Sequence, residues 1–118
     1  MKKLFLFFAL ITFFVTTSCS NDNNTSPEVT ILNITISNTE TYIYDLGSFG
    51  DEDGAGIKIQ PKHFEISETN RNSETDQIIY TYQPELNYKG NDFVVLSRSY
   101  GFPNPIVSLI RINFNITD

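Results

Sequence analysis

Residue types that build active sites and cross-links are scarce in this chain. Its 118 residues include one cysteine, one histidine and no tryptophan. A catalytic triad needs a base beside its nucleophile, and a zinc site needs three or four clustered ligands. His63 is the only imidazole, and we expect it to face solvent on an edge strand, so the sequence predicts no triad, no zinc site and no enzyme. With one cysteine no disulfide can form within the chain, and apolar packing must build the core.

Basic residues are also few. Eight lysines and arginines stand against 14 aspartates and glutamates, which gives a net charge of −6. The sequence has no run of basic residues beyond Lys2 and Lys3. Such a surface repels phosphate backbones, so we expect no nucleic-acid partner. Anionic lipid headgroups are repelled as well, and any membrane attachment must come from a lipid rather than from surface charge.

Only one apolar segment is long, and it is too short to cross a membrane. It runs from Leu4 to Val15, is interrupted only by Thr12, and covers 12 residues, whereas a transmembrane helix needs about 20. Lys2 and Lys3 precede it and small polar residues follow it. This layout is typical of a cleaved secretory signal.

The only cysteine lies where this apolar segment ends. The small residues before Cys19, Ser18 above all, resemble the processing site of bacterial lipoproteins. Thr16 departs from that pattern, which usually has leucine at this position. The resemblance implies cleavage after Ser18 and acylation of Cys19, for example with palmitate, and stable anchoring requires more than one acyl chain. The alternative is an ordinary secretory signal cut near Ser18, which leaves a free thiol.

These features predict three parts. Residues 1–18 form the signal peptide, residues 19–28 the lipidated cysteine and a flexible tether, and residues 29–118 one domain. Residues 20–27 contain no apolar side chain to bury and therefore read as a tether. The lipid would hold the domain in the cell envelope at the outer membrane, on its periplasmic or its surface-exposed face.

The domain shows the alternation of polar and apolar residues that is typical of half-buried strands. Strands are expected over residues 29–37, 42–46, 57–59, 63–66, 78–82, 91–99 and 110–117, of which residues 93–96 are apolar on both faces and suit a central strand. No stretch has the 3.6-residue period of a helix. About seven short strands predict an all-β fold, an antiparallel immunoglobulin-like β-sandwich. The last strand is the clearest, since Ile110, Ile112, Phe114 and Ile116 alternate with polar residues.

Three local features qualify the strand pattern. Val29 and Ile31 are out of phase with the apolar residues that follow them, which indicates a bulge or a two-sided start. Gly47 is expected to end the second strand. Phe64 and Ile66 are two residues apart, and we expect them to share one face.

A set of six residues in the second half resembles bacterial immunoglobulin-like and cadherin-like domains. The matching residues are Tyr82, Pro84, Tyr88, Gly90, Asp92 and Val94. Proline ends a strand, Gly90 allows a backbone conformation that other residues avoid, and Asp92 can accept hydrogen bonds from backbone amides of its own turn. The resemblance implies a fold and no particular activity.

Residues 50–56 combine three glycines with three consecutive acids, Asp51, Glu52 and Asp53, and are expected to form a loop. Calcium takes six to eight oxygen ligands, so these carboxylates form a candidate calcium site. The acids lack the one-residue alternation of a helix-loop-helix calcium site, and a solvated acidic turn is the alternative. We expect no other metal or cofactor.

The candidate ligand-binding residues are Tyr100 and Phe102, which lie in a proline-bounded loop at a strand end, where sandwich domains often place binding residues. Tyr42 and Tyr44 fit the core better. We therefore expect a non-catalytic binding, adhesion or accessory module with a protein or glycan ligand. The alternatives are a purely structural envelope lipoprotein, a small hydrolase that uses carboxylates such as Glu65 and Glu68, or a calcium-dependent domain.

Overall fold

The domain is a β-sandwich of seven strands. The computed structural model describes residues 26–49, 54–99 and 108–118, and within them there is no helix, hence none able to span a membrane. The strands are β1 (Glu28–Ser37), β2 (Tyr42–Ser48), β3 (Gly54–Ile59), β4 (Phe64–Arg71), β5 (Gln77–Pro84), β6 (Gly90–Ser99) and β7 (Ser108–Thr117). The predicted all-β sandwich is confirmed.

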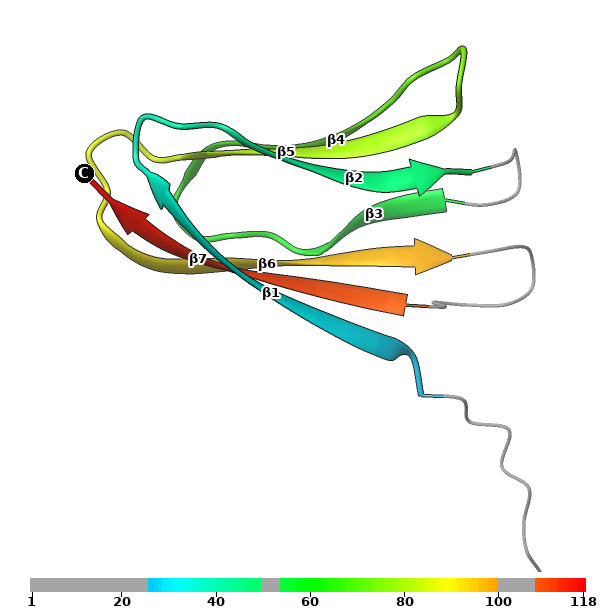
Figure 1. Cartoon of the computed structure of the whole chain (residues 1–118), viewed down its shortest axis with the longest axis horizontal. Coiled ribbons are helices and arrows are strands. Elements are labelled where there is room, and N and C mark those ends of the chain that lie inside the picture. The colour runs from blue at the N-terminus through cyan, green and yellow to red at the C-terminus, as the bar shows by residue number, and fades with distance from the viewer. Residues whose placement is uncertain (1–25, 50–53, 100–107) are drawn as a thin grey trace, which may run out of the picture.

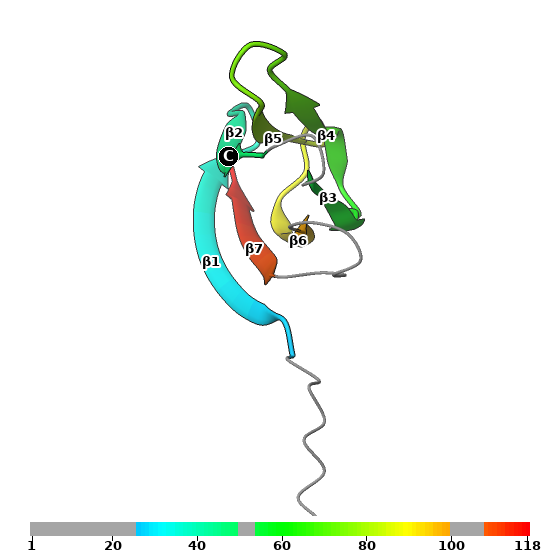
Figure 2. The ribbon, with the colours of Figure 1, turned by 90° about the vertical axis from the view of Figure 1, so that its right-hand side faces the viewer.

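The strands form two sheets that face each other (Figure 1). Sheet A has the order β1-β7-β6-β3, and sheet B has the order β2-β5-β4. All pairs are antiparallel except β1 with β7, which are parallel from Glu28 opposite Ser108 to Ser37 opposite Thr117. Figure 2 shows β1 along the outer side of β7. The first and last strands of the domain therefore close one edge of sheet A together, a pairing that the prediction of a wholly antiparallel sandwich did not include.

The core lies between the sheets and follows the predicted alternation. Its largest fully buried side chains include Tyr80 and Tyr82 of β5 and Phe114 of β7. The rings of Tyr82 and Phe114 stack with their centroids 4.0 Å apart, and Tyr42 meets Phe114 edge-on at 5.6 Å. Ile110, Ile112 and Ile116 are buried with Phe114, which confirms the predicted phase of the last strand.

The predicted irregularities of the first two strands are placed differently in the structure. The register of β1 with β7 is continuous through Val29 and Ile31, so the bulge is absent. The other alternative, a two-sided start, holds, because Val29 and Ile31 are exposed on one face while Leu32 packs against the core on the other. Gly47 does not end β2, because the strand continues to Ser48. A bulge lies there instead, with Leu46 as the extra residue and Gly47 at a φ of 103°.

Two further expectations are wrong because pairing with a neighbouring strand overrides the local pattern. β3 begins at Gly54, inside the expected loop, since Gly54 and Gly56 pair with residues of β6. Phe64 and Ile66 do not share a face. They oppose Pro84 and Gln83, which are adjacent in β5, because a bulge between Phe64 and Ile66 shifts the register by one residue.

Candidate functional site

A buried carboxylate joins the start of β6 to the segment that precedes β4. Asp92 is the only charged side chain that the described residues bury. Its Oδ1 accepts hydrogen bonds from the backbone amides of Lys62 and Phe93, both at 2.9 Å, and its Oδ2 accepts one from the amide of His63 at 2.8 Å. Only the Phe93 amide belongs to the neighbourhood that the sequence suggested. The other two come from about 30 residues away, so Asp92 fixes one end of the sandwich.

The hydroxyl of Tyr82 completes this buried polar group, and that of Tyr80 forms a separate hydrogen bond. The Tyr82 hydroxyl donates to the carbonyl of His63 at 3.0 Å and lies 3.2 Å from Asp92 Oδ2. Burial raises the pKa of Tyr82, and the neighbouring Asp92 charge raises it further. Burial likewise raises the pKa of Tyr80, whose hydroxyl bonds to Ser67 Oγ at 2.8 Å. Both tyrosines therefore remain neutral hydrogen-bonding groups.

His63 lies in the segment between β3 and β4 and not on the edge strand that the sequence suggested. Its ring stacks on Tyr88 at 4.0 Å with an interplanar angle of 8°, and its Nδ1 lies 3.1 Å from Glu85 Oε2. The side chain is 41% exposed. Within the described part of the chain no serine or threonine hydroxyl bonds to this ring. The imidazole is thus held by an aromatic ring and a carboxylate.

Beside these residues a groove of about 480 Å³ opens on sheet A, and we call it the sheet A groove. It is lined by Asn33, Ile34, Thr35, Lys62, His63, Asn91, Asp92, Phe93, Arg111, Asn113, Phe114 and Asn115. Most of the strand residues in this set occupy the outward positions of β1, β7 and β6, which alternate with the buried ones. The outer face of the sheet therefore contributes most of the lining.

The strand register places the outward residues of this face in rows. Asn33, Asn113 and Phe93 are direct neighbours across three strands. Arg111 Nε donates to Asn113 Oδ1 at 2.8 Å, and Asn113 Nδ2 donates to Asn33 Oδ1 at 3.1 Å. The Arg111 guanidinium also lies 4.0 Å above the Phe93 ring. A chain of hydrogen bonds thus runs from the arginine across the strands and fixes these side chains in place.

The next row consists of polar side chains without such bonds. Thr35, Asn115 and Asn91 are neighbours across the same strands, all three are exposed, and no hydrogen bond within the described residues uses their side chains. A carboxamide offers two donors and one acceptor oxygen. This row therefore presents free donors and acceptors to a ligand in the groove.

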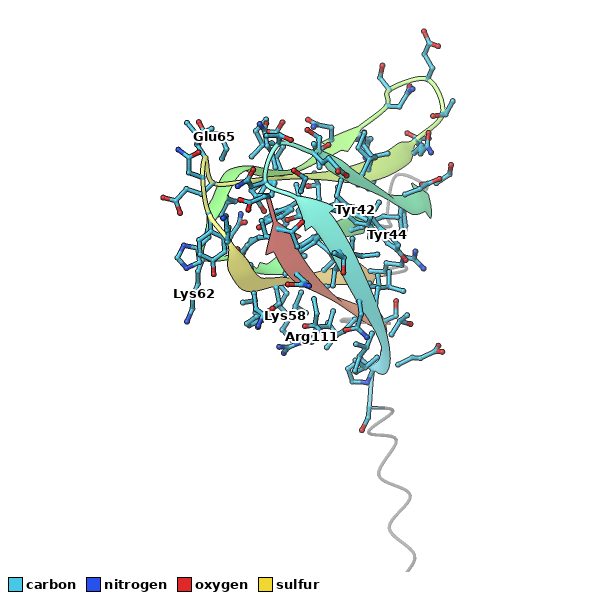
Figure 3. The ribbon with its side chains drawn as sticks, turned by 60° about the vertical axis from the view of Figure 1, so that its left-hand side comes forward. Tyr42, Tyr44, Lys58, Lys62, Glu65 and Arg111 are labelled. Atoms are coloured by element: carbon cyan, nitrogen blue, oxygen red, sulfur yellow. The ribbon has the colours of Figure 1, made fainter. Side chains whose placement is uncertain are left out.

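Positive charge gathers on this side of the molecule. Lys58, Lys62 and Arg111 come from three separate segments and project from the side of sheet A that faces away from sheet B (Figure 3). Among the described residues, none of the three forms an ion pair. The sequence showed only a scattered minority of basic residues, since the three come together through strand pairing. The acidic side chains Asp45, Glu65 and Glu68 lie instead on strands of sheet B.

Most of the site residues that the sequence singled out fall outside the part of the chain that the structure describes. Cys19, the acidic residues Asp51 to Asp53, and the aromatic pair Tyr100 and Phe102 are outside the described residues. Within the described ranges, no three histidine, cysteine, aspartate or glutamate side chains group as a metal site would require. Tyr42 and Tyr44 are half-buried on β2 and pack against the core (Figure 3).

Sequence reasoning missed the sheet A groove, although one signal for it was present. The outward positions of β7 carry Arg111, Asn113 and Asn115 in succession, next to Asn33 on β1. Repeated carboxamides on one strand face are a polar surface with fixed spacing. The partners that turn this surface into a groove, Lys62 and Phe93, become neighbours only in the folded chain.

Comparison with known proteins gives a likeness at the level of the fold. No protein-family model matches the sequence, and no curated protein matches it either. Among solved structures, a cysteine protease inhibitor from Entamoeba histolytica is similar, with a TM-score of 0.57 and 14% sequence identity. The match covers 78% of this chain and 98% of the inhibitor. At this identity the likeness concerns the fold alone, a small two-sheet all-β domain.

Proposed function

We propose that this chain is a lipid-anchored, non-catalytic binding module of the bacterial cell envelope. A lipid on Cys19 holds it at the outer membrane, residues 20–27 serve as a tether, and the sandwich presents a ligand-binding surface. The observation that carries the binding role is the sheet A groove. Among the described residues, its row of Thr35, Asn91 and Asn115 has no side-chain hydrogen bond, and its cations Lys62 and Arg111 have no ion pair. A groove of this size with a few convergent polar groups is suited to a ligand.

The groups nearest to catalytic chemistry favour a non-catalytic role. Three backbone amides and the Tyr82 hydroxyl surround the carboxylate of Asp92. His63 stacks on Tyr88 and pairs with Glu85. A general base needs a proton to abstract within hydrogen-bond reach. These two groups are engaged in holding the end of the sandwich together.

The positions of the motif residues support an immunoglobulin-like domain. Tyr82 and Asp92 meet inside the sandwich, while Tyr88 and Gly90 lie at the turn that joins β5 to β6. The Tyr88 hydroxyl donates to the carbonyl of Asn91 at 2.8 Å, and Gly90 has a φ of 135°. The motif therefore acts as one structural unit at this turn. The likeness to a protease inhibitor carries the fold only, so protease inhibition is an activity to test and forms no part of this proposal.

The test of the anchor is intact-protein mass spectrometry of the membrane fraction, with wild type beside Cys19→Ala. We expect the wild-type mass to correspond to loss of residues 1–18 plus acyl chains, and the variant to leave the membrane fraction. Protease treatment of whole cells then reports on which face the domain lies. An unmodified, soluble wild-type product would overturn the anchored form of the proposal.

A further inference from the structure

We infer that the sheet A groove binds a carboxylated polysaccharide, through the cations Lys62 and Arg111 and the polar row formed by Thr35, Asn91 and Asn115. This inference deepens the proposed binding role and rests on it. It names the surface and the chemical class of the ligand, which neither the fold nor the structural likeness supplies.

The charge distribution selects an anionic ligand. The chain has a net charge of −6, yet Lys58, Lys62 and Arg111 share one side of the sandwich (Figure 3) and form no ion pair with any described residue. Arg111 uses its Nε on Asn113, and its terminal Nη groups have no hydrogen-bond partner among the described residues. A guanidinium edge of this kind matches the two oxygens of a carboxylate.

The negative groups nearest to the groove leave this attraction in place. Asp92 lines the groove but is only 6% exposed, and backbone amides bond to both of its oxygens. Glu85 is paired with His63. The outward positions of β1, β6 and β7 within the groove carry no carboxylate. An incoming anion therefore meets unpaired positive charge beside neutral carboxamides.

The polar row selects a ligand rich in hydroxyl groups. Asn91, Asn115 and Thr35 stand on adjacent strands, which are about 4.8 Å apart, and the Asn33 row lies two residues along the strands, about 7 Å away. Sugar rings present several hydroxyl groups over such distances, and a carboxamide can donate to one hydroxyl and accept from the next. An acidic peptide would bind more naturally as a strand added along a sheet edge, whereas the groove lies over the face of sheet A, where β7 and β6 each have a paired strand on both sides.

The test is isothermal titration calorimetry with full-length protein in a non-ionic detergent. The probes are oligogalacturonate and its methyl-esterified form, which has the same sugar chain without the charges. We expect oligogalacturonate to bind and the ester to bind at least about tenfold more weakly, because it loses the charge-assisted bonds. Equal affinity for the two probes, or no binding of either, would overturn the inference.

Matched variants locate the site. Lys62→Gln removes a cation of the groove and should weaken binding roughly two- to fivefold, whereas Lys89→Gln removes a cation that pairs with Asp118 and should leave affinity unchanged. Asn115→Ala should weaken binding about two- to tenfold. It removes no hydrogen bond within the described chain, so the fold should persist, and the thermal transition checks this. Equal losses for Lys62→Gln and Lys89→Gln would contradict the assigned site.

Two further probes separate other anionic partners. Poly-glutamate that binds as tightly as oligogalacturonate would show that charge alone is recognised and would refute the sugar ligand. If vesicles that contain an anionic phospholipid bind and oligogalacturonate does not, this face would be assigned to a membrane surface instead. Mass spectrometry tests the anchor independently of binding. A protein that carries an acylated Cys19 but does not bind the sugar therefore refutes only the ligand. Sugar binding by an unacylated protein refutes only the anchor.

Discussion

At the scale of single residues, Asp92 is the described polar side chain that forms the most hydrogen bonds. It is buried and accepts hydrogen bonds from three backbone amides and from one hydroxyl. Hydrogen bonds to a charged group contribute about 1.5 to 3 kcal/mol each, and a buried donor left without a partner costs about 1 to 3 kcal/mol. Its removal therefore affects the ends of both sheets.

We expect Asp92→Ala to lower the free energy of unfolding by about 3 kcal/mol or more, because it leaves several buried donors without an acceptor. Asp92→Asn should cost less, since one oxygen remains as an acceptor. Urea denaturation at pH 7 measures both. Asp118→Asn, at an exposed carboxylate, is the control and should change stability by less than about 0.5 kcal/mol. A tolerated Asp92→Ala would mean that water reaches these amides.

The buried tyrosines predict how stability changes at high pH. Burial raises the pKa of Tyr80 and of Tyr82, so the unfolded chain loses these protons first, at its ordinary tyrosine pKa near 10. Their contribution is complete below pH about 10. Above that value it falls by about 1.4 kcal/mol per pH unit for each tyrosine, until the folded pKa is reached. Urea titrations between pH 8 and 11 measure this slope.

Phenylalanine substitutions assign the slope to these residues. Tyr80→Phe should remove one tyrosine's share of the pH dependence, and Tyr80→Phe with Tyr82→Phe should remove both shares. At pH 8 Tyr80→Phe should also be less stable than wild type by about 1 kcal/mol and the double variant by about 2 kcal/mol, since one and two hydrogen-bonded hydroxyl groups are lost. A double variant that keeps the wild-type slope would locate the titration at other groups.

Gly90 is a position where the backbone conformation requires glycine. Its φ of 135° disfavours side chains, and an added Cβ would lie 3.0 Å from the Tyr88 hydroxyl. We expect Gly90→Ala to destabilise the fold by about 1 to 3 kcal/mol. Gly54→Ala is the matched control, because nothing lies within 4 Å of its Cβ position and its φ is not positive. Thermal denaturation of the pair tests the difference, and equal melting temperatures would contradict it.

At the scale of elements, β7 organises sheet A. It pairs with β6 on one side and with β1 on the other, and its inward residues form the centre of the core. The same strand places Arg111, Asn113 and Asn115 on the outer face. Its alternation therefore serves packing on one side and the sheet A groove on the other.

Phe114→Ala should cost about 3 to 5 kcal/mol, because the ring is 1% exposed and stacks on Tyr82. That is a large part of the stability of a domain of this size. Phe64→Ala removes the same side chain from a site that is 39% exposed, and we expect a loss of about 1 kcal/mol or less. Chemical denaturation of the two variants compares them directly, and similar losses would place Phe114 outside the energetic core.

At the scale of the whole molecule, closure of sheet A depends on strands from opposite ends of the domain. β1 is the first strand and β7 the last, and they pair along ten residues each. Ile36 is buried, and Leu32 and Ile34 pack against the core from β1. An N-terminal truncation therefore tests the assembly of the whole sandwich.

Removal of residues 1–25 should leave a cooperative unfolding transition, because every described strand remains. Removal of residues 1–37 should abolish it, since β1 is lost and β7 gains an open edge. Far-ultraviolet circular dichroism during heating measures both proteins. A cooperative transition in the shorter protein would show that six strands suffice.

Alternation of side chains by itself determined the fold class and the buried face of the last strand. It could do so because the period of two is a local property of a strand that needs no knowledge of its neighbours. The motif around Tyr82, Gly90 and Asp92 was also visible as a structural unit. The tether and the lipid anchor at Cys19 remain predictions from the sequence.

Tertiary structure alone decided which residues meet. The bulges beside Gly47 and between Phe64 and Ile66 arise from pairing with β5, so local periodicity could not place them. The same holds for the parallel pairing of β1 with β7, for the distant amides bound by Asp92, and for the cations that share the outer side of sheet A. Each depends on contacts between residues far apart in the chain, and the sheet A groove exists only where those contacts form.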